Sequence, residues 1–169
     1  MSLSAAMLPE LDQEMAKTRT TLERIKEEMF DWKPHEKSFS FGDMANHLAR
    51  LPGWGAETLN SDSLDLDPET SGFSPPPPDE TLEGVLATFD QNVAEFRTAL
   101  AKAGDQDLVV EWSLFNAGEK LFTMPRVAVI RGMILNHIIH HRGQLTVYLR
   151  LNELPVPALY GPSADEGGM

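Results

Sequence analysis

The chain of 169 residues contains no cysteine. Disulfide bonds are therefore excluded, and so are protein thiols as nucleophiles or metal ligands. Any sulfur chemistry would need an external thiol of low molecular weight. Because proteins without disulfides are usual in a reducing compartment, we expect a cytoplasmic location.

Basic residues are scarce relative to acidic ones. Lysine and arginine total 14 against 26 aspartates and glutamates, a formal net charge of −12 at pH 7. This charge opposes a polyphosphate backbone and an anionic membrane surface, so we expect no nucleic-acid partner. The sequence also lacks an apolar run of the roughly 18 to 20 residues that a membrane span needs. Residues 1–11 lack a basic segment followed by a hydrophobic one, so we expect no membrane association.

The length predicts a single domain over residues 1–169. Apolar residues at alternating steps of three and four predict an amphipathic first helix over residues 8–29, with charged residues such as Glu14 on its other faces. A second helix is predicted to begin after Ser40, a good N-cap, with Asp43 in its first turn. The inward face of this second helix consists of Met44, His47, Leu48 and Leu51.

The segment from residue 60 to residue 79 is rich in Ser, Asp, Pro and Gly. It ends in the proline run Pro75–Pro78, which is typical of a stiff crossover, whereas binding to an SH3-like or WW-like partner is a less favoured alternative. Asp79 is predicted to cap a third helix over residues 80–103. From residue 108 to residue 122 the apolar period changes to two, which predicts a short extended hairpin.

A fourth helix is predicted to open at Thr123 and Pro125 and to end at Asn152, followed by an irregular tail from about residue 155. Four amphipathic helices with a long crossover between the second and third are typical of a bundle. The sequence therefore predicts an all-α fold, a four-helix bundle with a short extended hairpin before the last helix.

Two histidines one helical turn apart carry the clearest chemical signal. His137 and His141 lie four residues apart in the apolar pattern of the fourth helix, so their Cβ atoms should be about 5 to 6 Å apart. At that separation both imidazoles can bind one metal ion at about 2.0 to 2.1 Å. His47, on the inner face of the second helix, is the natural third ligand. Three imidazoles leave at least one coordination position open to water or substrate.

Each histidine also has a plainer interpretation. A lone histidine on an apolar helix face is more often a hydrogen-bonded core residue than a ligand. His140 is a rival within the pair, but it lies about 100° around the helix from His141, which favours an outer or surface position. Ile138 stands where a zincin-type metalloprotease needs glutamate, so the sequence does not predict a peptidase of that type.

Three polar residues near the histidines have two interpretations each. Gln144 lies on the same helical face as the pair and could orient a water or a substrate, or it could be a core residue bonded to backbone. Arg142 is predicted to pair with an acidic group on a neighbouring helix, ahead of binding a substrate anion. Asp43 could orient the His47 imidazole or stabilise the start of its helix.

Several segments, in their order and spacing, resemble the DinB/YfiT-like metalloenzyme family, which is unrelated to the DNA polymerase that shares the name. The resemblance covers residues 8–166 and is carried by Trp32-Lys33-Pro34, Ser38-Phe39-Ser40-Phe41-Gly42-Asp43, the stretch from His137 to Leu145, and the stretch from Val156 to Glu166. It implies a four-helix bundle, commonly a homodimer. It also implies a divalent metal such as nickel or zinc held by His47, His137 and His141.

Members of this family include thiol-dependent S-transferases and a maleylpyruvate isomerase that uses a low-molecular-weight thiol. The resemblance therefore implies an enzyme whose metal activates water or an external low-molecular-weight thiol, acting on a small molecule as a transferase or hydrolase. No catalytic residue is assigned, and Gln144 is only a weak candidate. The alternative is a non-catalytic stress-response protein that binds a metal or a small ligand, because acid-base residues beyond the histidines are hard to identify.

Overall fold

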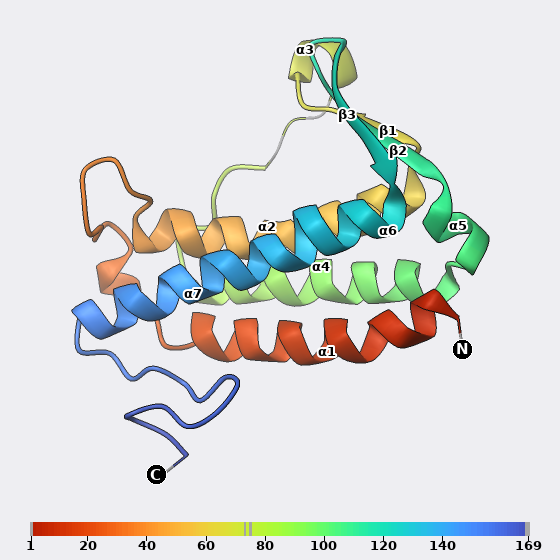
Figure 1. The fold of residues 1–169 in the computed structure, drawn as a ribbon. Helices are drawn as coiled ribbons and strands as arrows, with labels where there is room; N and C mark the ends of the chain where they lie inside the picture. The colour runs from red at the N-terminus through yellow and green to blue at the C-terminus, as the bar shows by residue number, and fades with distance from the viewer. Residues whose placement is uncertain (1, 73, 75, 168–169) are drawn as a thin grey trace.

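The computed structural model describes residues 2–72, 74 and 76–167. Four long helical stretches lie side by side, and a small sheet covers one end of them (Figure 1). The stretches are α1 (Leu3–Leu22), α2 (Phe41–Asn60), α4 (Leu82–Lys102), and a last one made of α6 (Arg126–Val129), a π-helical segment (Ile130–Leu135) and α7 (Asn136–Leu151). The short elements are a 3₁₀ turn (Glu27–Met29), α3 (Pro68–Ser71) and α5 (Asp105–Val109). Within the described residues, no helix is long and apolar enough to cross a membrane.

The start of α2 follows the prediction, whereas α1 ends early. Ser40 Oγ accepts a hydrogen bond from Asp43 N at 3.1 Å, and Ser40 N donates to Asp43 Oδ2 at 3.0 Å. α1 stops at Leu22, although the apolar stripe predicted a helix as far as residue 29. The chain turns so that Phe30 O accepts from Gly42 N at 2.9 Å, one of the N–H groups that the start of α2 cannot satisfy internally. Because this hydrogen bond joins residues that are not close in the sequence, no local pattern predicts it.

α4 begins at Leu82 with Thr81 as its N-cap, and not with Asp79 as predicted. Thr81 Oγ1 accepts a hydrogen bond from Gly84 N at 3.1 Å. Asp79 instead holds the end of the crossover against α2. Its backbone N–H donates to Asn46 Oδ1 at 2.7 Å, and its backbone oxygen accepts from Asn46 Nδ2 at 2.9 Å.

A three-stranded mixed sheet overturns the predicted all-α four-helix bundle, so the protein is α/β. β2 (Glu111–Asn116) and β3 (Glu119–Pro125) form the predicted hairpin, and β1 (Ser63–Asp65) pairs with β2 in parallel. The turn residues Ala117 and Gly118 both have positive φ, which matches the twist of a two-residue hairpin. The sequence analysis predicted the hairpin but missed β1 and its parallel pairing with β2.

β1 was not predicted because it is short and lies in a segment rich in Ser and Asp. Its position depends on contacts with residues far along the chain. Leu64 is aligned with Leu114 of β2, and the Asp65 carboxylate accepts hydrogen bonds from Ala117 N at 3.0 Å and Gly118 N at 2.8 Å. These partners, rather than local propensity, make the segment a strand.

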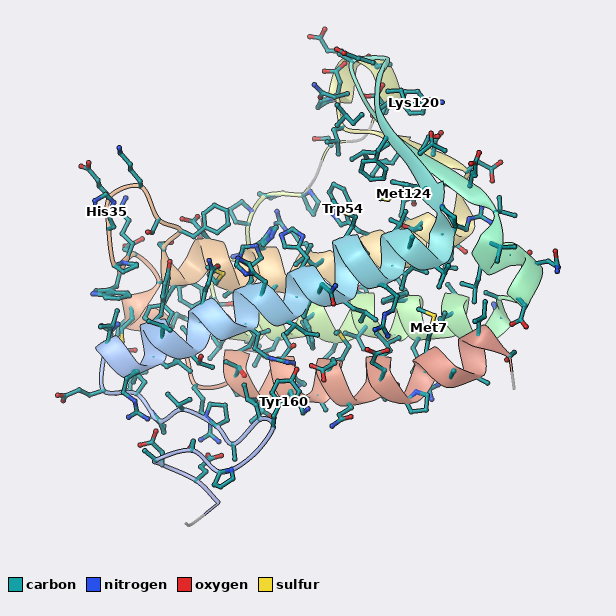
Figure 2. All side chains as sticks on the ribbon, viewed as in Figure 1. Met7, His35, Trp54, Lys120, Met124 and Tyr160 are labelled. Atoms are coloured by element: carbon teal, nitrogen blue, oxygen red, sulfur yellow. The ribbon has the colours of Figure 1, made fainter. Side chains whose placement is uncertain are left out.

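The buried apolar side chains form two clusters. The larger one lies among the long helices. The smaller one joins the sheet to the helices and consists of Leu64, Trp112, Leu114 and Val129. Trp54 of α2 packs against both clusters and faces the sheet (Figure 2). The sheet therefore rests on the helices through a small core of its own.

The crossover and the C-terminal tail have little regular structure. Pro75 of the proline run lies outside the described residues, and residues 76–78 are exposed and form no helix or strand. Arg50 Nη2 of α2 donates to Pro77 O at 2.5 Å, which attaches the run to the helices. The last helix ends at Leu151, as predicted, and residues 152–167 form no helix or strand.

Candidate metal centre

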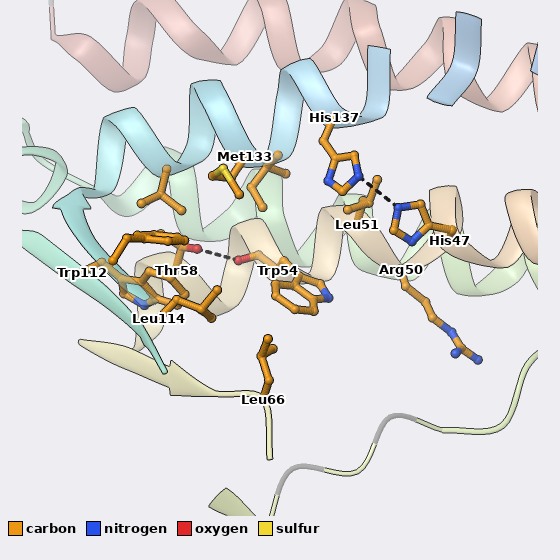
Figure 3. A pocket seen from close by; sticks show the side chains of 13 residues that line it. His47, Arg50, Leu51, Trp54, Thr58, Leu66, Trp112, Leu114, Met133 and His137 are labelled. Carbon is orange, nitrogen blue, oxygen red and sulfur yellow. Dashed lines mark hydrogen bonds between the residues drawn. The ribbon is translucent and has the colours of Figure 1, made fainter. Parts of the chain in front are cut away.

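Three histidine side chains meet between α2 and α7. His47 comes from α2, and His137 and His141 come from successive turns of α7. Their ring centroids are 4.6 to 4.9 Å apart, and one nitrogen of each ring lies within 4.8 Å of the other two. His47 Nε2 and His137 Nε2 are 3.2 Å apart (Figure 3), close to the roughly 3.3 Å between two nitrogens on one tetrahedral ion. The structure thus brings together the three residues that were predicted as ligands, in an arrangement compatible with a metal site.

The π-helical segment that precedes α7 influences the direction in which His137 and His141 point. Val129, Met133 and His137 line one cavity, and with His141 they follow one another at steps of four residues. In an ordinary α-helix such a series rotates by about 40° at each step. The wider turns of the π-helical segment (Ile130–Leu135) counteract this drift, and π-helical turns inside helices are frequent at functional sites.

Burial keeps His47 uncharged at neutral pH. Burial, followed by the charges of His141 and His137, lowers the pKa of His47 to about 4. Burial also lowers the pKa of His141, although the hydrogen bond with Gln144 acts in the opposite direction. Within the described residues, the group of side chains able to hold an ion here consists of imidazoles and includes no carboxylate. At neutral pH His47 is therefore an uncharged base facing other bases, an arrangement that a bound cation stabilises.

Gln144 orients one of the three imidazoles. His141 Nδ1 donates to Gln144 Oε1 at 2.7 Å, which leaves His141 Nε2 as the atom available for an ion. Such hydrogen bonds to the second ring nitrogen set the tautomer and the ring orientation of metal-binding histidines. Gln144 is exposed, so the alternative of a core glutamine is wrong. A role in orienting water or substrate stays a prediction.

The remaining candidates lie outside the three-histidine cluster. His140 is exposed, with its ring centroid 5.0 Å from that of His141. Asp43 takes part in the cap of α2, the helix-stabilising role of the two that were predicted. Ile138 is buried in the main core, so the position that would carry the glutamate of a zincin holds the helix in place instead.

Arg142 belongs to a second polar cluster, on the side of α7 that faces α1. It is 1% exposed, and it donates to Glu14 O at 2.9 Å, to the Glu14 carboxylate and to Tyr160 Oη. Tyr160 reaches α1 from the tail and donates to Glu14 Oε2 at 2.6 Å (Figure 2). Burial raises the pKa of Glu14, but the hydrogen bonds from Tyr160 and Arg142 outweigh it and leave the pKa below its ordinary value. The predicted pairing of Arg142 with an acid is confirmed, whereas the outer position expected for Glu14 is wrong.

An apolar cavity of about 390 Å³ opens from the histidine cluster toward the sheet (Figure 3). His47 and His137 line one end, and Trp112 and Leu114 line the other. Sequence reasoning missed this cavity because the strands form much of its wall, and their position over α2 depends on tertiary contacts. The alternating apolar pattern around Trp112 predicted the hairpin, but it did not predict the surface against which the hairpin packs.

Phe39 is a further residue near the cluster that was not singled out. Its ring centroid lies 5.7 Å from that of His47 and 6.2 Å from that of His141. Tyr148 Oη donates to Phe39 O at 3.1 Å, which holds the backbone of this loop against α7. With 45% of its surface exposed, Phe39 partly covers the histidines from the solvent side.

Known proteins share this fold and parts of this sequence. The model of the DinB family matches residues 1–167. A DinB-like protein from Bacillus cereus ATCC 10987 has a similar structure, with a TM-score of 0.69 and 21% identity over 94% of this chain and 98% of that one. The DinB-like protein YjoA from Bacillus subtilis gives a TM-score of 0.66 and 18% identity over 89% of this chain and 95% of its own. These two likenesses concern the fold alone.

One curated sequence is similar over part of its length. The uncharacterized protein YrdA of Bacillus subtilis (strain 168) is 31% identical over 85 residues, 48% of this chain and 50% of YrdA. The chain thus spans about half the length of the curated relative that it matches.

Proposed function

This chain belongs to the DinB family, and from that premise we propose that it is a metal-dependent enzyme whose His47, His137 and His141 hold one divalent transition metal ion, nickel or zinc. The convergence of three imidazole nitrogens within 4.8 Å of one another, at the end of an apolar cavity, carries this proposal. When bound, such an ion lowers the pKa of a coordinated water or thiol toward neutrality. The reaction class is S-transfer from an external low-molecular-weight thiol, or hydrolysis.

The donor set selects the kind of metal. Imidazole nitrogens suit zinc, nickel, copper and iron, whereas magnesium and calcium prefer oxygen ligands. A structural zinc site would normally be closed by four protein ligands. Here the described residues supply three, which leaves a position for a small molecule.

The chain's own residues have distinct tasks in this proposal. Gln144 accepts a hydrogen bond from His141 Nδ1, which leaves Nε2 as the nitrogen free to bind the ion. Phe39 shields the cluster from one side, and an apolar occupant of the cavity would exclude water from the other. With no protein thiol in the sequence, a sulfur nucleophile must enter as a small molecule.

Elemental analysis of tag-free protein tests the metal site. We expect close to one transition metal ion per chain, and its loss in His137→Ala. His140→Ala is the matched control, because it removes an adjacent, exposed imidazole outside the cluster and should retain the metal. Stoichiometric metal in His137→Ala would rule out the assignment.

A second candidate, a non-catalytic metal- or ligand-binding protein, is favoured by one observation. Among the described residues that line the cavity there is no aspartate or glutamate to act as general base. A panel of biological thiols and electrophiles, applied to the metal-loaded protein, separates the two candidates. Turnover that disappears in His47→Ala supports the enzyme, whereas tight binding of a small molecule without any turnover supports the binding protein.

A further inference from the structure

The cavity beside the histidines is built for an apolar occupant. Its walls come from α2, from the π-helical segment and from the sheet, and three of its side chains are the aromatic rings of Trp54, Trp112 and Phe122. Leu66, which follows β1, lines the cavity near Trp54 (Figure 3). Aromatic and branched aliphatic walls favour apolar ligands, since the burial of apolar surface drives their binding.

Two polar side-chain groups along the walls, those of Thr58 and Trp112, are already used within the protein. Thr58 Oγ1 donates to Trp54 O at 2.8 Å, and Trp112 Nε1 donates to Ser61 Oγ at 3.3 Å. They offer an occupant little hydrogen bonding, so a polar body would lose its hydration there without replacement.

At the histidine end of the cavity, by contrast, polar groups are available to an occupant. His47 and His137 line this end, and Arg50, one helical turn after His47, has a buried Nε without a partner. The rest of the Arg50 guanidinium is turned toward the crossover, where Nη2 donates to Pro77 O. The cavity therefore has an apolar end at the sheet and a polar end at the candidate metal centre. The polar groups of the cavity without partners within the protein lie at this second end.

The volume limits the size of the occupant. A cavity of about 150 Å³ holds one benzene molecule, so about 390 Å³ accommodates a body of roughly two rings or an aliphatic chain of similar bulk. We propose that this cavity binds the uncharged apolar body of the substrate, with the polar reacting group held at His47, His137 and His141. The placement of the reacting group rests on the proposed function, whereas the binding of the apolar body does not.

Binding of prodan, an uncharged two-ring naphthalene probe, tests the proposal on the full chain. We expect saturable binding at one site per chain, with a blue shift of its fluorescence. Leu66→Arg places a charge at the cavity wall and should weaken binding by about tenfold or more. Leu121→Arg is the matched control, because Leu121 is exposed on β3 next to Phe122 but does not line the cavity, and it should leave the affinity unchanged.

Nickel tests whether the occupant reaches the histidines. One equivalent of Ni²⁺ should quench the bound probe in the wild type and leave it bright in His137→Ala. Absence of saturable binding, or equal weakening by both leucine substitutions in variants with wild-type circular dichroism, would overturn the proposal. Metal content is measured on the same samples: a protein that binds prodan as expected but no metal contradicts the proposed function alone, and one that binds metal but not prodan contradicts this inference alone.

Discussion

His141 and Arg142 are adjacent in α7, yet their side chains enter two polar clusters of opposite character. Arg142 meets a carboxylate and a phenol, so the charges and hydrogen bonds of its cluster are balanced within the chain. His141 meets two other imidazoles, and the cluster contains bases alone among the described residues. A polar cluster that balances its own charge serves the fold, whereas one that collects bases without an acid is suited to an external cation.

The largest expected effect would come from breaking the balanced cluster. Arg142→Ala removes the buried cation that donates to the Glu14 carboxylate and leaves Lys17, at 3.4 Å, as its remaining ionic partner, so we expect a loss of about 3 kcal/mol in the free energy of unfolding. Arg131→Ala, which removes an exposed arginine paired with Glu10, is the matched control and should cost about 1 kcal/mol or less. Urea unfolding measures both. A small loss in Arg142→Ala would show that this cluster is not structural.

Loosening the histidine cluster should leave stability almost unchanged and weaken metal binding instead. Gln144→Ala frees the His141 ring to rotate, and loss of such a supporting hydrogen bond typically weakens metal affinity by about 10 to 100 fold. Competition with a fluorescent chelator measures this affinity. Thr146→Ala, two residues further along α7 and away from the histidines, serves as the control. Equal affinity in Gln144→Ala and the wild type would contradict the orienting role.

The smallest expected effect is a loss of stability of the metal-free protein in acid, caused by the histidine cluster. The pKa of His47 in the folded state is about 4, below the value of about 6.5 of a free histidine. Between these values the unfolded chain binds more protons than the folded one, so acid destabilises the metal-free protein. Full stability is expected above pH 6.5, with a loss of about 1 kcal/mol on going from pH 7 to pH 5.5.

Urea unfolding of chelator-treated protein at the two pH values measures this loss. In His47→Asn the difference between pH 7 and pH 5.5 should shrink, because the group responsible is gone. A wild type and a His47→Asn variant with the same pH dependence would show that His47 titrates normally in the folded protein.

The helices and the histidines could be read from the sequence because both depend on local spacing. The four-residue step between His137 and His141 ensures that they share a helix face, and the Ser40–Asp43 cap marks where the helix of His47 begins. Arg142 was expected to find an acid on a neighbouring helix. The identity of that acid was not predictable, since Glu14 belonged to a face that the pattern assigned to solvent.

The sheet shows where local reasoning fails. Leu64 and Asp65 lie in a segment whose composition indicates a loop, and they form a strand because β2 and the hairpin turn lie beside them in space. Helical periodicity repeats within a few residues, whereas a parallel strand depends on partners about fifty positions away. The predicted four-helix bundle included the hairpin but not β1 or its pairing with β2, and it did not predict the cavity.

By itself the sequence determined the helical register of three imidazoles and the absence of any protein thiol, because side-chain spacing along a helix and residue identity need no partner. The tertiary structure alone decided that these imidazoles converge without an acid, that Glu14 neutralises Arg142 while Tyr160 bonds to both, and that a sheet encloses an apolar cavity beside the histidines. Burial and long-range pairing act between elements that are distant in the chain, and so they become defined only when those elements pack together.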